Sequence, residues 1–310
     1  MTNFPAAREG IIGIDVASAT VAIYDQITNT HCSVANQLDA LVQALTPLRG
    51  RALVVCEATG GYEDQLLVAL HSLGIPVHRA DGRRLNAYAR SIGPAKTDRI
   101  DAQMLARYGL ERFDRLARYS PAGQAQASLV ALVRRRIELI ETRKIERTRA
   151  KAPRAHLVAH SIHALIGVLD QQIESIDAQI QALLSKAADL EKRRSTLQTI
   201  PGVGQQTAIA LLALMPELGT LSRRQAASLA AVAPHPRDSG TSNAPRRTSG
   251  GRRSLRPILF IAALSATRGT NPLASFYRRL ITNGKAKKTA IVAVMRKIVV
   301  IANARLAQLT

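Results

Sequence analysis

Four acidic residues have the types and the spacing that could bind divalent metal ions. Asp15 in IGIDVAS and Glu57 in VVCEATG each end a short run of β-branched residues, which is the pattern of a buried strand. Asp98 and Asp101 in AKTDRIDA are three residues apart in a segment with helical spacing, so both carboxylates project from one face of a helix. Two divalent ions about 4 Å apart can stabilise the attacking and leaving oxygens of phosphodiester cleavage. The four acids therefore indicate a metal-dependent enzyme that acts on nucleic acid.

Each acid taken alone has a simpler explanation. An Asp after a strand is commonly a loop residue, Asp98 could cap a helix, and Asp101 could face the helix dipole. Glu57 is harder to explain in this way, because a carboxylate at the end of a buried strand needs a cation or hydrogen-bond donors nearby. All four acids occur in the order strand, strand, helix, which favours the metal hypothesis.

A polar loop around Ser239 is the second candidate site. A serine hydroxyl could attack a phosphodiester where guanidinium groups neutralise the developing charge. The segment Asp-Ser-Gly is equally typical of a turn whose arginines bind phosphate without catalysis. No His–Asp relay can be identified, although His235 is nearby, so a metal-bound hydroxide, a carboxylate or water would have to accept the proton. The surrounding arginines are Arg237, Arg246, Arg247, Arg252 and Arg253.

The segment IPGVGQQTA resembles the hairpin of a helix-hairpin-helix element. Gly202 and Gly204 permit a tight turn, and their amides with the following helix N-terminus could hold a backbone phosphate. Such a contact would position a duplex without reading its sequence. The alternative is a turn between helices with no role in binding.

The charge of the chain is concentrated in its second part. The net charge is +21 over 310 residues, yet residues 1–110 hold ten Lys/Arg and ten Asp/Glu. From Ser239 to the C-terminus there are fourteen Lys/Arg and no acidic residue. Such a block repels itself unless a polyanion neutralises it, and its apolar runs ILFIAALSA and AIVAVM argue against an unfolded basic tail. Nucleic acid is therefore the expected partner.

The other compositional features are those of a cytosolic protein. Cys32 and Cys56 both lie in the candidate sheet region, and we expect two reduced, buried thiols without a disulfide. No apolar stretch has membrane-spanning length, and the N-terminus MTNFPAAREG lacks the apolar core of a signal peptide. We expect a cytoplasmic location with no membrane partner.

Residues 11–110 alternate strand and helix patterns. Three successive strands, two strand–helix units and two further helices have the order of a ribonuclease-H-like α/β domain, in which the first strand and a later central strand bring their acids to one end of the sheet. The predicted strands are IIGIDVA, TVAIYDQ, THCSVAN, ALVVCEA and PVHRA, and the predicted helices are LDALVQALTPL, YEDQLLVALHSLG, 83–92 and 98–110.

The rest of the chain has a helical pattern. Residues 122–198 read as two long helices separated at Pro153, whose apolar 3–4 spacing favours a coiled coil or an antiparallel hairpin over one face of an ordinary bundle. The C-terminal part is expected to contain helices near 223–232, 254–268 and 285–308. The predicted fold is thus α/β plus all-α, with a catalytic domain at 1–115, a helical coiled-coil linker at 116–198 and a mostly helical domain at 199–310.

Five segments in this order resemble one known family. They are IGIDVAS, CEATGGYE, AKTDRIDAQMLA, TIPGVGQQTA and LAAVAPHPRDSGTS with RRTSGGRRSLR, and together they extend from about residue 9 to 305. The chain resembles the bacterial insertion-sequence transposases of the "one-ten" family, also called DEDD transposases. KTDRIDA and the proline-rich loop ending in Ser-Gly are specific to that family, whereas the GID tripeptide is not.

The resemblance implies a Holliday-junction-resolvase-like (RuvC-like) domain, a coiled-coil linker and a C-terminal transposase domain. It implies that Asp15, Glu57, Asp98 and Asp101 bind Mg²⁺, with Mn²⁺ as a substitute, and that Ser239 becomes covalently joined to DNA. It also implies a structured non-coding guide RNA that pairs with donor and target DNA. Homo-oligomers, dimers or tetramers, are implied as well, with acids of one subunit completing a site with the serine of another. The neighbouring hydroxyls of Thr241, Ser242, Thr248 and Ser249 are alternative nucleophiles.

Three functions from different classes are compatible with these features. The first is an RNA-guided DNA transposase or recombinase, associated with the nucleoid, that moves its own insertion sequence. The second is a structure-specific DNA endonuclease that uses only the four acids and two metal ions. The third is a nucleic-acid-binding protein without catalysis, in which the acids only cap and pair. The full order of motifs favours the first.

Overall fold

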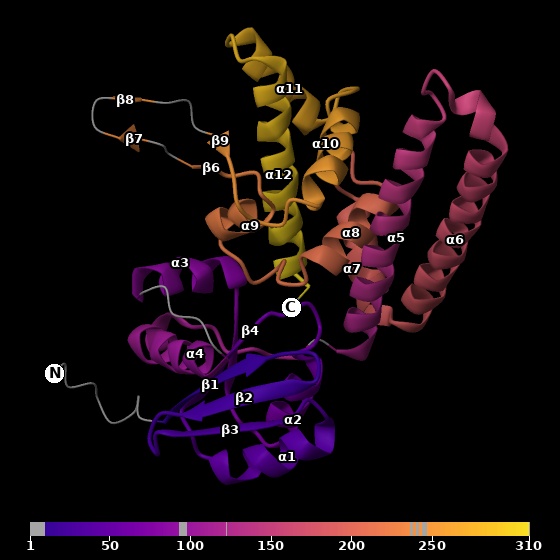
Figure 1. Ribbon diagram of the computed structural model, residues 1–310. Helices are drawn as coiled ribbons and strands as arrows, with labels where there is room; N and C mark the ends of the chain where they lie inside the picture. Colours follow the sequence, from indigo (N-terminus) through magenta and orange to yellow (C-terminus); the bar gives the residue numbers. More distant parts are fainter. Residues whose placement is uncertain are drawn as a thin grey trace. The chain divides into compact units, whose positions relative to one another are not determined.

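The computed structural model describes residues 10–92, 98–121, 123–235, 238–239, 242–243 and 247–309 (Figure 1). For Asp98, Ser239 and a few of their neighbours, only the backbone is described. The chain divides into two compact units, Met1–Ala122 and Gly123–Thr310, and each is described here by itself.

The first unit contains a five-stranded sheet with the strand order β3-β2-β1-β4-β5. β1 pairs antiparallel with β2 and β2 with β3, whereas β1 pairs parallel with β4 and β4 with β5. This mixed order is consistent with the predicted ribonuclease-H-like arrangement. The strands are β1 (Ile11–Val16), β2 (Thr20–Asp25), β3 (Thr30–Ala35), β4 (Leu53–Glu57) and β5 (Val77–Ala80).

Helices cover both faces of this sheet because the central strands are apolar on both sides. Alternate residues of β1 face opposite layers: Ile12 and Ile14 pack with Leu41 and Leu66, whereas Ile11 packs in the core that contains Leu105. α1 and α2 therefore lie on one face and α3 and α4 on the other (Figure 1). The helices of this unit are α1 (Leu38–Leu45), η2 (Thr46–Leu48), α2 (Asp64–Ser72), α3 (Gly82–Ile92), α4 (Asp98–Arg112) and η3 (Phe113–Arg115).

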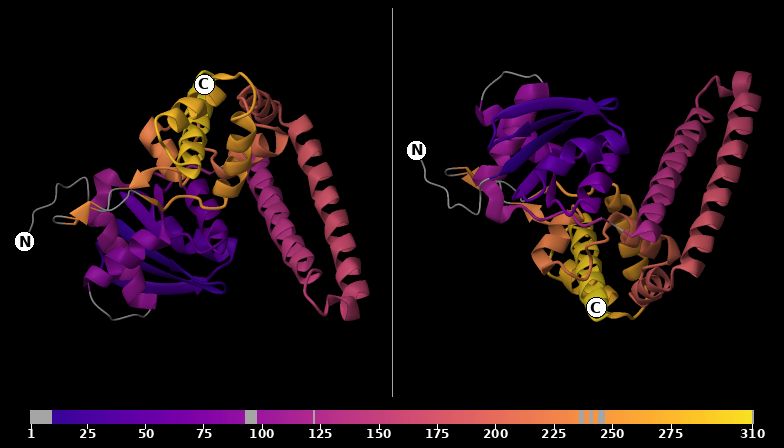
Figure 2. Two further views of the ribbon diagram at one scale, coloured as in Figure 1. Left: turned by 90° about the horizontal axis from the view of Figure 1, so that it is seen from above. Right: turned by 90° about the horizontal axis from the view of Figure 1, so that it is seen from below.

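The second unit begins with a helical hairpin. Helices α5 (Gln124–Arg149) and α6 (Ala159–Lys186) pack against each other and lie side by side in both views of Figure 2. Pro153 lies between them, as predicted, followed by the short helix η4 (Ala155–Val158). The second helix was predicted to continue to residue 198, but α6 ends at Lys186, because Ala187 has the non-helical angles φ −111° and ψ 81°. Leu139 contacts Leu169 and Ile173 in a small apolar seam. An intramolecular hairpin is thus present, and pairing with a second copy stays a prediction.

The remaining helices form the large core of this unit around α12. The base of the hairpin joins that core, since Val133 and Ile180 are buried in the same cluster as Leu211 and Ile298. The elements are α7 (Ala188–Gln198), α8 (Gln205–Leu214), α9 (Arg223–Leu229), α10 (Leu255–Ala266), α11 (Pro272–Thr282) and α12 (Lys287–Ala307), with short strands β6 (Pro234–His235), β7 (Asp238–Ser239), β8 (Ser242–Asn243) and β9 (Arg247–Thr248).

Helix α11 was not predicted from the sequence, although a helix start signal was present at Asn271 and Pro272. Asn271 caps this helix by accepting hydrogen bonds from the backbone N–H groups of Leu273, at 2.9 Å, and Ala274, at 3.0 Å. Pro272 occupies the first helical position, where its missing N–H is harmless. Asn-Pro before an apolar periodic segment therefore marked the beginning of a helix rather than a loop.

One expectation about the cysteines was wrong. Both thiols are free, but only Cys56 is buried, and Cys32 is exposed. The reason is topological: β3 is an edge strand of the sheet with no buried side chain, whereas β4 lies inside the sheet and four of its five residues are buried. Burial raises the pKa of Cys56 to about 12, so this thiol stays protonated. Among the described helices, none has the length and apolar character needed to span a membrane.

Candidate active site

Asp15 and Glu57 lie at the same end of two neighbouring parallel strands. Glu57 is the last residue of β4, and the register pairs Ile14 of β1 with Cys56 of β4, so the two acids follow this pair side by side. Side chains alternate along a strand, and Ile11 and Val55 face the α4 layer. Asp15 comes four residues after Ile11, and Glu57 comes two residues after Val55, so both acids are on that same face. Both are half-buried.

Helix α4 brings Asp101 to this end of the sheet. A Cβ added at Gly13 would lie 1.8 Å from the carbonyl oxygen of Ala102, and one added at Gly109 would lie 2.7 Å from Ile11 Cγ2. The helix therefore runs antiparallel to β1, with its N-terminal turn toward the carboxyl end of the strand. Asp101 precedes Ala102, is half-buried and lies in this N-terminal turn, and its joining Asp15 and Glu57 in one site stays a prediction.

The close approach of α4 depends on Gly13. With no side chain at this position, the helix backbone can lie directly on the strand, and any Cβ would collide with main-chain atoms. The GID tripeptide thus combines a packing residue with an acid two positions later. Asp98 begins α4, but its side chain lies outside the described residues.

The carboxylate of Glu57 rests against the first residue of α3. A Cβ at Gly82 would lie 2.4 Å from Glu57 Oε1, so any side chain at this position would require the Glu57 carboxylate to move. Within the described part of the chain, no three His, Cys, Asp or Glu side chains lie close enough together to hold a metal ion. The set of donors is nevertheless of the right kind, because Mg²⁺ and Mn²⁺ prefer carboxylate oxygens.

Sequence reasoning missed Glu63, a completely buried carboxylate that follows the Glu57 segment. Burial opposes its ionisation, but hydrogen bonds from the Gly61 amide, the Thr59 hydroxyl and the Arg79 guanidinium outweigh this and lower the pKa of Glu63 to about 2. The residue was visible in CEATGGYE, but nothing in the sequence distinguished it from an ordinary first-turn acid of α2.

Two short antiparallel strand pairs are described in the Ser239 segment. β6 pairs antiparallel with β9, placing Pro234 opposite Thr248, and β7 pairs antiparallel with β8, placing Ser239 opposite Ser242. Two residues of the sequence separate Ser239 from Ser242. The side chains of Ser239, Ser242 and His235 lie outside the described residues, as do Thr241, Arg237 and Arg246.

The base of this loop is anchored by Gly251 and Arg252. A Cβ at Gly251 would lie 2.3 Å from the carbonyl oxygen of Ser228, and the Arg252 amide donates to Leu229 O at 2.7 Å. The Arg252 guanidinium binds both carboxylate oxygens of Glu217, with Nη1 2.7 Å from Oε2. Burial opposes ionisation of Glu217, but Arg252 lowers its pKa. Arg252, predicted to bind nucleic acid, thus holds the loop to the core.

The other predicted phosphate-binding residues differ in their surroundings. Gly202 has φ +82°, and a Cβ there would lie 2.2 Å from the carbonyl oxygen of Ala262, so this glycine lets the turn pack on α10. Gly204 is exposed at the N-cap of α8, with open space beside its Cα. Arg253 is exposed, whereas only the backbone of Arg247 is described. Binding of nucleic acid by these residues stays a prediction.

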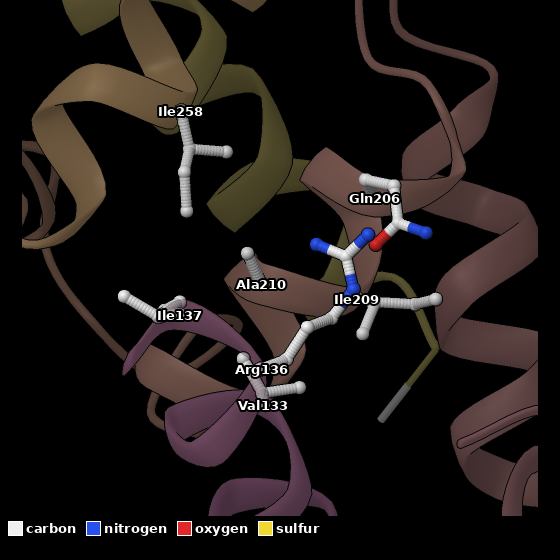
Figure 3. Close-up of a pocket in the computed structure, with 7 residues that line it drawn as sticks. All are labelled: Val133, Arg136, Ile137, Gln206, Ile209, Ala210 and Ile258. Carbon is white, nitrogen blue, oxygen red and sulfur yellow. The ribbon is translucent and has the colours of Figure 1, made fainter. Parts of the chain in front are cut away.

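A small pocket between α5, α8 and α10 carries no comparable chemistry. Figure 3 shows that its walls are largely apolar and that the Arg136 guanidinium points toward Gln206. Arg136 is bound to Asp177, with Nε 2.6 Å from Oδ1 and Nη2 3.1 Å from Oδ2. Its charge is therefore neutralised within the hairpin.

Comparison with known proteins identifies the family of the chain. The DEDD transposases of the IS110 type match residues 12–159, and the group described as "Transposase IS116/IS110/IS902 family" matches residues 194–278. The chain is 31% identical over 313 residues to the pilin gene-inverting protein of Moraxella lacunata, covering 96% of this chain and 95% of that relative. The pilin gene-inverting protein of Moraxella bovis is also 31% identical, over 310 residues with the same coverage.

These similarities extend over nearly the whole chain and include both the acid-bearing unit and the Ser239 region. DEDD transposases depend on divalent metal ions in general, and their substrate is DNA. The chain belongs to the IS110 family of transposases and is an enzyme that cuts and rejoins DNA.

Proposed function

We propose that this transposase rejoins DNA through a covalent serine intermediate, with its acids binding Mg²⁺ and a structured non-coding RNA selecting the sites. The observation that carries the proposal is that β1 and β4 end side by side and that the N-terminal turn of α4 lies at this end of the sheet. Asp15 and Glu57 follow a parallel register pair on the face covered by α4, whose first turn holds Asp98 and Asp101. Separate segments of the chain thus direct acids to one end of the sheet.

Asp15, Glu57, Asp98 and Asp101 would hold the metal ions. Their oxygens suit Mg²⁺, or Mn²⁺ in its place, and the absence of a side chain at Gly82 leaves space for the Glu57 carboxylate. When bound, such ions stabilise negative charge on the attacking and leaving oxygens of a phosphodiester.

Ser239 is the proposed nucleophile. Its Oγ would attack the phosphorus atom, lose its proton and form a serine–phosphate ester, while the bond from phosphorus to one strand's oxygen breaks and that oxygen takes up a proton. The hydroxyl of another strand would then attack the same phosphorus and release the serine. Arg237, Arg246, Arg247 and Arg253, around Ser239 in the sequence, would neutralise phosphate charge in both steps.

The proposed partners are donor DNA, target DNA and the guide RNA, bound by a homo-oligomer. Support comes from the absence of acidic residues between Ser239 and the C-terminus, where fourteen Lys/Arg occur. A guide RNA would leave the protein to contact backbone phosphates rather than base edges.

The names of the relatives favour inversion as one outcome of this reaction. Both relatives are described as pilin gene-inverting proteins. Inversion, excision and insertion require the same breakage and joining of strands and differ in the arrangement of the two sites. We therefore propose that the chain inverts a segment when its sites are in opposite orientation and moves it otherwise.

The test is to compare strand cleavage by the wild type and by Ser239→Ala, with Ser249→Ala as the matched hydroxyl control. With end-labelled junction DNA, Mg²⁺ and transcripts of the DNA flanking the gene, the wild type and Ser249→Ala should give a protease-sensitive protein–DNA band on denaturing gels. Ser239→Ala should lose this band by about 10³-fold or more. Asp15→Asn should also abolish cleavage.

Two outcomes would contradict the proposal. Free DNA ends produced equally by Ser239→Ala would indicate a nuclease that uses only the acids. Undiminished recombination without any flanking transcript would exclude RNA guidance.

A further inference from the structure

The segment that follows Glu57, residues 58–62, is held by a buried carboxylate. Glu63 is 0% exposed, and its Oε2 accepts hydrogen bonds from the Thr59 amide at 3.1 Å, the Thr59 hydroxyl at 2.8 Å and the Gly61 amide at 2.9 Å. Its Oε1 accepts from Arg79 Nε at 2.7 Å. The segment itself contains two glycines with positive φ, Gly60 at 83° and Gly61 at 123°. Glu63 therefore fixes a stretch of backbone that would otherwise have great freedom.

Arg79 connects this anchor to the sheet. It lies on β5 directly opposite Cys56, one residue before the position opposite Glu57. The carboxylate of Glu63 thus ties the segment after Glu57 to the neighbouring strand, one residue before the level of Glu57. The Ala58 amide donates to Ala80 O at 3.1 Å and continues the ladder by one residue.

A second anchor joins this segment to the chain that follows Asp15. The side-chain amide of Asn36 donates to Ala17 O at 3.0 Å and to Tyr62 O at 2.9 Å. Ala17 comes two residues after Asp15, and Tyr62 is the last residue of the 58–62 segment. Asn36 Oδ1 is buried and accepts no hydrogen bond from the described residues. Asn36 therefore acts through the two N–H groups of its side-chain amide. Aspartate, which has no such donors, could not make these two hydrogen bonds.

We propose that Asn36 and Glu63 are positioning residues that hold Asp15 and Glu57 in the relative placement needed to bind metal together. The inference rests on the proposed function, in which both acids are metal ligands. Ligand carboxylates must be held to within about 0.5 Å of their binding geometry, and partners that orient ligands typically contribute 10- to 100-fold to metal affinity. The two anchors restrain the backbone immediately after each acid and link the two segments to each other.

The sheet offers a matched control at its opposite end. Asp25, 3% exposed, pairs with Arg51 at 2.6 Å and also accepts a hydrogen bond from the Ile27 amide at 3.0 Å. Asp25 lies opposite Ile12, at the end of β1 away from Asp15. Glu63→Gln and Asp25→Asn thus remove the same kind of buried, arginine-paired charge from one unit, but only Glu63 is next to the candidate metal ligands.

The experiment measures Mn²⁺ affinity of the full chain by electron paramagnetic resonance, together with the thermal midpoint of each variant. Glu63→Gln is expected to weaken Mn²⁺ binding by 10- to 100-fold, and Asn36→Ala by about 10-fold. Asp25→Asn should lower the thermal midpoint as Glu63→Gln does and leave Mn²⁺ affinity within about two-fold of the wild type, below the effect of an orienting partner. Asn36→Ala, at a half-buried position, provides the answer if Glu63→Gln does not fold.

The outcomes separate this inference from the proposed function. If the wild type binds Mn²⁺ and Asp15→Asn abolishes binding, yet Asn36→Ala and every folded Glu63 variant bind normally, the inference is wrong and the proposed function stands. Equal weakening by Asp25→Asn would also overturn it, by showing a general loss of stability. If the Asp15→Asn variant binds Mn²⁺ with the same affinity as the wild type, the proposed metal site is wrong, and the inference is wrong with it.

Discussion

Glu63 and Gly82 show how single residues define the surroundings of the predicted acids. Gly82 contributes by lacking a side chain, which leaves space for Glu57 Oε1. Glu63 contributes an ionised carboxylate in a buried position, where unpaired charge would be strongly unfavourable. The donors around Glu63 more than offset the cost of burial, and they lower its pKa to about 2.

This lowered pKa predicts a specific dependence of stability on pH. An unfolded glutamate has a pKa of about 4.3, so Glu63 adds stability above that pH, and this contribution is lost as the pH falls toward 2. Near neutral pH, Glu63→Gln should lower the free energy of unfolding by about 3 kcal/mol. Urea unfolding of the wild type and the variant from pH 7 to pH 3 would test this. A difference that stays constant below pH 4 would contradict the assignment.

At the scale of elements, the contact between α4 and β1 determines where the acids meet. Gly13 allows the helix backbone to lie on the strand, and Gly109 allows the next part of the helix to lie over Ile11 and Val55. The two glycines differ in what a Cβ would meet. At Gly13 it would meet main-chain atoms of Ala102 and Ala106, whereas at Gly109 it would meet the Cγ2 methyl groups of the buried Ile11 and Val55 side chains.

This difference predicts unequal effects of the same substitution. Gly13→Ala should reduce the free energy of unfolding by about 3 kcal/mol, since the backbone of α4 must move, and should abolish DNA cleavage even where the chain is folded. Gly109→Ala should cost about 1 kcal/mol, because overpacking against the buried Ile11 and Val55 methyl groups is partly offset by the preference of helices for alanine over glycine. Chemical unfolding and a cleavage assay would measure both. Normal cleavage by folded Gly13→Ala would show that Asp101 need not lie so close to β1.

At the scale of the whole molecule, positive charge is distributed unevenly along the chain. Residues 1–110 are neutral, whereas α11, α12 and the turn between them carry exposed basic side chains and no acid. Two of these groups flank one aromatic ring, with Lys297 Nζ 4.6 Å and the Arg279 guanidinium 5.6 Å from the Phe276 ring centre. The exposed basic residues of this region are Arg278, Arg279, Lys285, Lys287, Lys288, Arg296 and Lys297.

We predict that these charges make nucleic-acid binding strongly dependent on salt. With six to ten phosphate contacts, affinity should fall by about 10³- to 10⁵-fold between 50 and 200 mM salt. Replacing Lys287 and Lys288 by glutamine should reduce the slope of log affinity against log salt by about 2. Arg49→Gln, an exposed position of the first unit, is the control and should leave the slope unchanged. Fluorescence anisotropy with labelled duplex DNA would measure the slopes. An unchanged slope in the lysine variant would show that Lys287 and Lys288 do not contact the phosphates of the DNA.

The sequence by itself determined the five strands of the first unit, the two helices on either side of Pro153 and the strand ends at which Asp15 and Glu57 occur. Local patterns were sufficient here, because the apolar runs in IIGIDV and LVVCE indicate buried strands and because Pro153 interrupts the helical pattern. The family followed from motifs in a fixed order. The α/β character of the first unit and the helical character of the rest were therefore predictable.

The tertiary structure alone decided which residues support those acids. Asn36 meets Ala17 and Tyr62 from 19 and 26 residues away along the chain, and Gly202 contacts Ala262. Cys32 is exposed because its strand is an outer one. No local pattern encodes such contacts, since they depend on which elements become neighbours and at what distance their backbones pack. Composition and spacing specify the elements, whereas the fit of their surfaces specifies the partners of each side chain.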